Sequence, residues 1–144
     1  MPASFHFLDD VALADLAFDA EGDSVQEVFD AASQAVMEAM ADPATVGATW
    51  TRRVEHAGAD LAELLFDWLS DIVYWKDAAG VVFSRAALSV AQAGAEWRLA
   101  ATLTGEPVNR TTQELRNDVK GVTKHLYRLH QEHGRWRARV VLDV

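Results

Sequence analysis

Two acidic residues near opposite ends of the chain could form a cation site. Asp15 opens the strand-like alternation of residues 15–20, and Asp143 closes a second strand-like segment, residues 137–144. A chain that ends inside an apolar strand ties its terminal carboxylate to the fold, whereas most termini fray. If the two strands are neighbours, Asp15 and Asp143 converge, and two bare carboxylates about 4 Å apart repel by roughly 4 kcal/mol at an effective dielectric near 20. Such a pair requires a shared proton or a cation, which makes it a candidate site.

The sequence gives little support for other kinds of catalytic or metal site. The chain has no Cys, which excludes disulfides, thiolate zinc sites and a cysteine nucleophile. It also has no glycine-rich phosphate loop, no nucleophile elbow, and no His-x-x-x-His or Glu-x-x-His metal pair. The histidines are scattered over four expected elements, at positions 6, 56, 125, 130 and 133. A bound metal would therefore take carboxylate and carbonyl oxygens, which favours Ca²⁺ or Mg²⁺.

Composition sets limits on the fold and on the partners. At 144 residues, with half of them hydrophobic and 24% charged, the chain predicts one globular domain over residues 1–144. The net charge of −9 argues against a broad phosphate-binding surface, but it is compatible with a cation or a basic protein partner. No apolar run is long enough to span a bilayer, and residues 1–6 do not resemble a signal peptide, so we expect a cytoplasmic protein.

Basic residues are concentrated in the last third of the chain, whereas the first 50 residues contain no Lys or Arg. This asymmetry indicates either an ordinary solvated face or a surface that steers a partner. The basic residues of the last third include Arg116, Lys120, Lys124, Arg128, Arg135, Arg137 and Arg139.

The first half of the chain predicts two strands, a helix, a strand and a second helix. Residues 5–8 and 15–20 are the first two strands, with a turn at 21–23. Ser24 with Glu27, and later Asp60 with Glu63, form capping boxes that begin helices with apolar faces. Residues 42–43 stop the first helix, and residues 50–54 form the strand between the helices.

Acidic residues at four-residue spacing occupy the opposite face of the second helix, at Glu63, Asp67 and Asp71. Like charges at this spacing repel. The face is either solvated or a surface for a basic partner or for metal-borne charge.

The second half predicts four further strands, over residues 81–90, 96–104, 118–128 and 137–144. Breaks at residues 93–94, 105–107 and 132–134 separate them. The expected order is a strand pair, a helix, a strand, a second helix and then a run of strands. This order predicts an α+β fold, with a largely antiparallel sheet and two main helices packed on it.

The residues also resemble the archease family, small proteins that activate the GTP-dependent ligase of tRNA splicing and RNA repair. The resemblance covers nearly the whole chain, from Phe7 to Val144, and its order and spacing make it specific. Its pieces are residues 7–9, 14–16, 20–24, 27–29, the helix at 60–69 continuing to Tyr74, and residues 105–107, 119–123 and 142–144. The chain departs from the usual family pattern at residues 10–13, where two residues are inserted and a His-Thr pair is missing, and at Lys124, where an aromatic residue is common.

The resemblance implies an archease-like α+β fold and a divalent-cation site, usually of calcium. Carried over by position, its ligands are Asp15, Asp143 and Val144, the last through backbone or terminal oxygens. It also implies a protein that is not an enzyme and has no catalytic residues of its own. Such a protein would bind the ligase, promote its guanylylation and multiple turnover, and have no strong affinity for nucleic acid or membranes.

Two other functions compete with that expectation. A metal-dependent phosphoesterase could use the same carboxylates, although two-metal hydrolysis requires several ligands around ions about 3.5–4 Å apart. A divergent relative could instead bind another protein without any metal.

Overall fold

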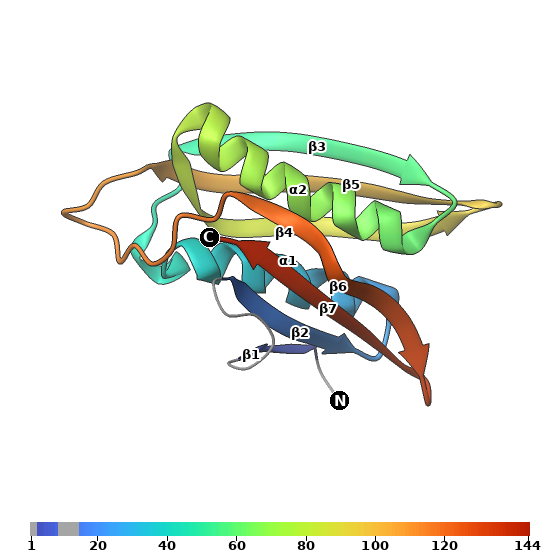
Figure 1. Cartoon of the computed structure of the whole chain (residues 1–144). Coiled ribbons are helices and arrows are strands. Elements are labelled where there is room, and N and C mark those ends of the chain that lie inside the picture. The colour runs from blue at the N-terminus through green and yellow to red at the C-terminus, as the bar shows by residue number, and fades with distance from the viewer. Residues whose placement is uncertain (1–2, 9–14) are drawn as a thin grey trace.

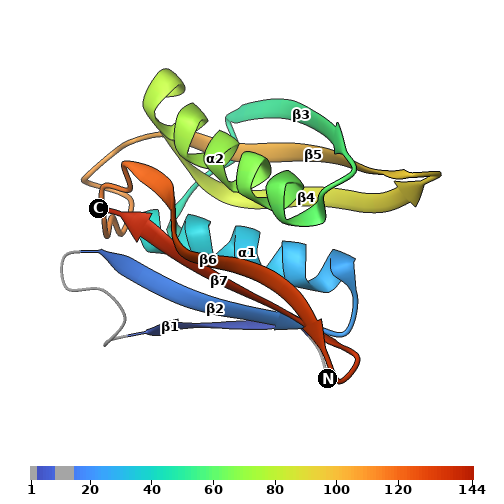
Figure 2. The ribbon, with the colours of Figure 1, turned by 45° about the vertical axis from the view of Figure 1, so that its right-hand side comes forward.

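Two antiparallel sheets enclose two helices (Figures 1 and 2). The computed structural model describes residues 3–8 and 15–144. One sheet has the order β1-β2-β7-β6 and the other β3-β5-β4. The elements are β1 (Ser4–Leu8), β2 (Leu16–Gly22), α1 (Val25–Met40), a 3₁₀ turn (Pro43–Thr45), β3 (Trp50–Gly58), α2 (Leu61–Ala79), β4 (Val81–Ala93), β5 (Glu96–Pro107), β6 (Gly121–Glu132) and β7 (Arg135–Asp143).

Helix α1 begins and ends where the sequence predicts. The Ser24 hydroxyl accepts the backbone N–H of Glu27 at 3.1 Å, and the Glu27 carboxylate accepts that of Asp23 at 2.9 Å. The first bond satisfies an N–H group that the first turn leaves without a helical partner, and the second ties the residue before the cap to the helix. The helix ends at Met40, and the side chain of Asp42 then caps the 3₁₀ turn.

Helix α2 is fixed by its ends and by its buried face. Asp60 accepts the N–H groups of Ala62 and Glu63, and the helix ends at Gly80, whose φ of 64° is a left-handed conformation that glycine adopts without strain. Trp68 is fully buried, and its indole N–H donates to the Ser33 hydroxyl of α1 at 2.7 Å. The hydroxyl of Ser33 in turn donates to the Phe29 carbonyl, so the polar atoms in this part of the core are satisfied.

Strand β2 lies between β1 and β7, so an early segment of the chain pairs with the last strand. The β2–β7 register places Leu16 opposite Leu142 and Asp19 opposite Arg139. Phe18 and Ala20 point into the core with no exposed surface, while Asp19 and Glu21 alternate onto the outer face. The alternation predicted for residues 15–20 is therefore confirmed over residues 16–20, and the strand begins at Leu16 rather than at Asp15.

The α+β class and the antiparallel pairing are confirmed, but the strands form two sheets rather than one. Most strands are longer than predicted, and β2 extends to Gly22, two residues into the turn expected at residues 21–23. The break expected at residues 105–107 is wrong, because β5 runs through Pro107. Gly105 is required there for another reason: a Cβ atom at this position would collide with the Val82 carbonyl oxygen of β4.

The acidic face of α2 is largely engaged within the fold. Glu63 pairs with Lys124 of β6, and Asp71 pairs with His56 of β3. Only Asp67 of the three acids is exposed without an ion pair among the described residues. Two of the three acids on this face of α2 are therefore paired within the fold, which leaves little free negative charge for a basic partner. Across the described ranges, neither helix is long and apolar enough to cross a membrane.

Substitutions on the two faces of α2 should differ sharply in their effect on stability. Leu65 is fully buried, so Leu65→Ala should lower the free energy of unfolding by roughly 2–5 kcal/mol through the cavity that it leaves. Asp67→Asn, two residues further along on the exposed face, should change it by less than about 0.5 kcal/mol. Urea denaturation of the two variants checks this, and a larger loss for Asp67→Asn would contradict the orientation of the helix.

Candidate cation site at the end of β2 and β7

The structure brings Asp15 and Asp143 to one end of the β2–β7 pair. Leu16 is the first residue of β2 and pairs with Leu142 of β7. Asp15 directly precedes Leu16 and Asp143 directly follows Leu142, so continuing this register by one residue would place the two acids opposite each other. Leu142 belongs to the core and Asp143 is exposed, so alternation directs the Asp143 side chain to the outer face of the sheet. Asp19 of β2 lies on that same face, and by the same alternation so does Asp15.

The backbone around Asp143 is held on its other side by β6. Gly121 is the register partner of Asp143, and the Lys120 N–H donates to the Asp143 carbonyl oxygen at 2.7 Å. Val144 is half-buried and packs against the core. The main chain at this end of the sheet is therefore fixed from both sides, while the Asp143 carboxylate remains available.

The donor set at this end of the sheet fits a hard divalent cation. Asp15 and Asp143 offer carboxylate oxygens and Val144 offers backbone oxygens, which are ligands that Ca²⁺ and Mg²⁺ prefer. Within residues 3–8 and 15–144, no three or more His, Asp or Glu side chains gather into a ready-made metal cluster. Two side chains plus backbone oxygens leave coordination positions for water, as is usual for Mg²⁺ and common for Ca²⁺. Asp9 and Asp10, expected to form a turn, lie outside the described residues.

A buried lysine holds the segment that leads to this site. Lys76, near the end of α2, is only 8% exposed, and its ammonium donates to Asp118 at 2.6 Å and to the Val119 carbonyl at 2.5 Å. Asp77 is a third partner at 3.0 Å. Burial favours the neutral amine, but the hydrogen bonds to Asp118 and Asp77 outweigh it and hold the pKa of Lys76 above its ordinary value. All three donors are used, so Lys76 fixes residues 118–119 immediately before β6. The strand predicted from residue 118 therefore begins only at Gly121.

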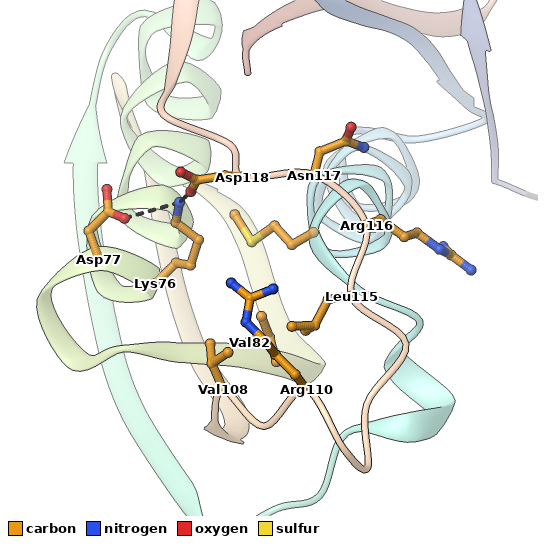
Figure 3. Close-up of a pocket in the computed structure, with 10 residues that line it drawn as sticks. Lys76, Asp77, Val82, Val108, Arg110, Leu115, Arg116, Asn117 and Asp118 are labelled. Carbon is orange, nitrogen blue, oxygen red and sulfur yellow. Dashed lines mark hydrogen bonds and ion pairs between the residues drawn. The ribbon is translucent and has the colours of Figure 1, made fainter.

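A cavity of about 390 Å³ lies beside this lysine (Figure 3). Its apolar lining comes from Met40, Val82, Val108 and Leu115. Arg110 points into the cavity from the loop after β5, and its guanidinium forms no ion pair or hydrogen bond with other described residues. The sequence did not single out Lys76, because its partners Asp118 and Val119 lie more than 40 residues further along the chain. It did not single out Arg110 either, because the cavity is lined by segments that are distant in the sequence.

The histidines do not converge on a site. His56 pairs with Asp71 between β3 and α2, His6 lies 3.9 Å from Asp19 on the outer face of β1, and His130 lies near Glu132 on β6. His133 stands in the turn between β6 and β7 with a φ of 52°. This distribution agrees with a site built from oxygen ligands rather than imidazoles.

Ion pairs cross the outer face of the same sheet. The Arg139 guanidinium donates to both carboxylate oxygens of Asp19, at 2.8 and 2.9 Å, and so joins β7 to β2 side by side. Arg135 reaches Glu21 at 3.4 Å and Asp23 at 2.5 Å. The hydrogen bonds from Arg139 hold the pKa of Asp19 below its usual value.

Together these features define a small α+β protein in which two antiparallel sheets enclose two helices and a pair of carboxylates ends one sheet. The chain belongs to the archease family. The model described as "Archease protein family (MTH1598/TM1083)" matches residues 5–144. The Protein archease of Methanothermobacter thermautotrophicus is 35% identical over 140 residues, which are 97% of this chain and 98% of that relative. The Protein archease of Methanopyrus kandleri is 30% identical over 131 residues, or 91% and 94% of the two chains.

Solved structures support the same assignment. The solution structure of protein 1598 of Methanobacterium thermoautotrophicum matches with a TM-score of 0.82 at 35% identity, over 97% of this chain and 98% of that one. A crystal structure from Thermotoga maritima, called an archease and possible chaperone, matches with a TM-score of 0.62 over 96% and 98% of the two chains. At 18% identity, the second match shows the fold alone.

The Asp19–Arg139 pair should contribute to stability in a pH-dependent way. The folded-state pKa of Asp19 is depressed, so its contribution is present above the unfolded value of about 3.9 and is lost as the pH falls from there through the folded value. Asp19→Asn should therefore reduce the free energy of unfolding at pH 7 and make its decline below about pH 4 shallower. Urea melts of both proteins between about pH 2 and 7 measure this. Curves that stay parallel over the whole range would contradict the assignment.

Proposed function

We propose that this protein is a non-catalytic, divalent-cation-binding activator of a GTP-dependent RNA ligase, acting in the cytoplasm in tRNA splicing or RNA repair. The ligase would be its protein partner, and its effect would be faster guanylylation and repeated turnover of that enzyme. The observation that supports the proposal is the pairing of Leu16 with Leu142, which leaves Asp15 and Asp143 next to this pair, in a chain that matches the archease family over residues 5–144.

The bound cation would serve two purposes in this proposal. It would neutralise Asp15 and Asp143, which otherwise repel each other across the end of two neighbouring strands. It would also present positive charge at an exposed edge of the molecule, where a partner's nucleotide-binding site could receive it. The protein supplies the ligands and their placement, because β2 and β7 hold the backbone on which both acids stand.

A non-catalytic role is supported by the chemistry of the described residues. Nothing in them combines a nucleophile, a base and a phosphate-binding loop at one place. The most deeply buried cation, Lys76, already uses its three donors on Asp118, Asp77 and the Val119 carbonyl. Acceleration of another enzyme is therefore a better match to this surface than a reaction of its own.

Cation binding should depend on both carboxylates. Asp15→Asn and Asp143→Asn should each abolish measurable binding of Ca²⁺ and Mg²⁺ in isothermal titration, because each removes one of two charged ligands. Asp67→Asn, which removes one acid from the exposed face of α2, is the matched control and should bind as the wild type does. Unchanged affinity in either site variant would remove the assignment, and loss of the folded state would make that carboxylate structural instead.

Activation should appear only with a ligase present. Guanylylation of the organism's GTP-dependent RNA ligase should accelerate when the wild-type protein or Asp67→Asn is added, and Asp143→Asn should give no acceleration. The protein alone should not hydrolyse nucleotides or a generic phosphoester. Metal-dependent phosphoester cleavage that Asp143→Asn loses would replace the activator with an enzyme. Acceleration that persists in Asp143→Asn would show that the cation is not needed for activation.

A further inference from the structure

The outer face of β6 and β7 carries a concentration of arginines in a chain whose net charge is −9. Register pairs Arg128 of β6 with Arg139 of β7, and His130 with Arg137. The strands run side by side in both views of the ribbon (Figures 1 and 2). On β6, the inward Tyr127 and Leu129 pack against the core, which leaves Arg128 and His130 on the outer face.

The charges on this face are not balanced. Arg139 is neutralised by Asp19, and Glu21 receives Arg135 at 3.4 Å and Arg137 at 3.6 Å. Arg128 stands directly opposite Arg139. It lies near enough to Asp19 to help Arg139 lower the pKa of that carboxyl, but its side chain forms no ion pair or hydrogen bond within the described part of the chain. Like charges directly opposite each other destabilise a sheet. An anion beside Arg128 would remove this cost.

A recess of about 60 Å³ opens at this point. It is lined by Asp19, Glu21, Arg128, His130, Arg137, Ala138 and Arg139. Three arginines against two carboxylates leave one net positive charge around it. The volume corresponds to roughly two water molecules, which is close to the size of one phosphate group.

His130 provides a second, independent observation, a polar atom without a hydrogen-bond partner. Its Nδ1 atom is buried and has no hydrogen-bond partner. Its other ring nitrogen, Nε2, lies 3.4 Å from Glu132. Buried polar atoms in folded proteins are nearly always paired, so the unpaired Nδ1 is an unsatisfied polar atom in a residue that lines the recess.

We propose that this recess is a subsite for a single phosphodiester group of an RNA strand, held by Arg128 and Arg137 with His130 beside them. One negative charge matches the one net positive charge of the lining. Arg128 approaches from β6 without an ion pair, and Arg137 approaches from β7, where it also lies 3.6 Å from Glu21. Two guanidinium groups on different strands suit a tetrahedral oxyanion with acceptors in several directions. A planar carboxylate is bound well by a single guanidinium group, as Arg139 binds both oxygens of Asp19. Two guanidinium groups on different strands therefore suit a phosphodiester better than a carboxylate.

The choice of RNA rests on the proposed function, because the proposed partner acts on RNA. The recess also shares the outer face of the sheet with the candidate cation site. Arg139 and Asp143 are four residues apart on β7, a separation of about 13 Å. An RNA strand bound by the ligase could therefore contact the arginines while the acidic end of the sheet reaches the enzyme.

The test uses this protein without any ligase, so its outcome does not depend on the proposed function. Binding of a fluorescent single-stranded oligouridylate is followed by anisotropy between about 50 and 200 mM salt, for wild type, Arg128→Gln and Arg85→Gln. Arg85 is the matched control, because it is an exposed arginine of β4 in the other sheet. Loss of one phosphate contact should lower the slope of log affinity against log salt by about 0.7 and weaken binding roughly eightfold at 50 mM salt.

We expect these changes in Arg128→Gln alone, together with a shift of the Arg128 and Arg137 side-chain Nε resonances when the oligonucleotide is added. Equal losses in both variants would overturn the subsite in favour of diffuse attraction. Absence of measurable binding at 50 mM salt would overturn it as well. If a glutamate peptide of the same charge displaces the oligonucleotide with equal affinity, the face binds an acidic protein segment and the RNA assignment is wrong.

Discussion

The antiparallel pairing of β2 with β7 is the interaction on which the candidate site depends. It joins segments that are 120 residues apart at the Asp19–Arg139 contact, and it fixes their register by burying Phe18, Val140 and Leu142 on one face. A slip of one residue would turn these side chains to solvent, so the register is strongly specified. The same register arranges the ion pairs of the outer face, and it pairs Leu16 with Leu142, the neighbours of Asp15 and Asp143 in the chain. Packing of the core on one side of the sheet therefore fixes the strand register, and this register determines which residues lie together at the candidate site on the other side.

Helix boundaries and the class of fold could be predicted because their causes are local. Ser24 and Asp60 cap their helices through hydrogen bonds to N–H groups two or three residues away, and such spacing is visible in the sequence. Strand ends depend on distant partners and were less predictable. Gly105 and Pro107 resemble a break, yet β4 and β3 keep β5 extended through them. The division into two sheets also follows from pairings that no local pattern encodes.

In the candidate site, too, features with local causes could be predicted from the sequence, and features that depend on distant partners could not. Asp15 and Asp143 could be singled out because alternating strands near both ends of the chain place acids at their ends, and the resemblance added Val144. Lys76 could not, because its role depends on Asp118 and Val119, which are more than 40 residues further along the chain. Arg128 was visible only as one of many basic residues in the last third. Its opposition to Arg139, and the recess between them, required the register of β6 and β7.

The central claim is that a divalent cation binds where β7 ends beside the start of β2. Paramagnetic broadening by Mn²⁺ in an amide NMR spectrum locates such an ion without reference to any partner. We predict that substoichiometric Mn²⁺ broadens the amides of Asp15, Gly121 and Asp143 first, that excess Ca²⁺ or Mg²⁺ restores them, and that Gly94 in the β4–β5 turn is unaffected. Broadening centred on the acidic face of α2, at Asp67, or spread evenly over exposed carboxylates would contradict the account.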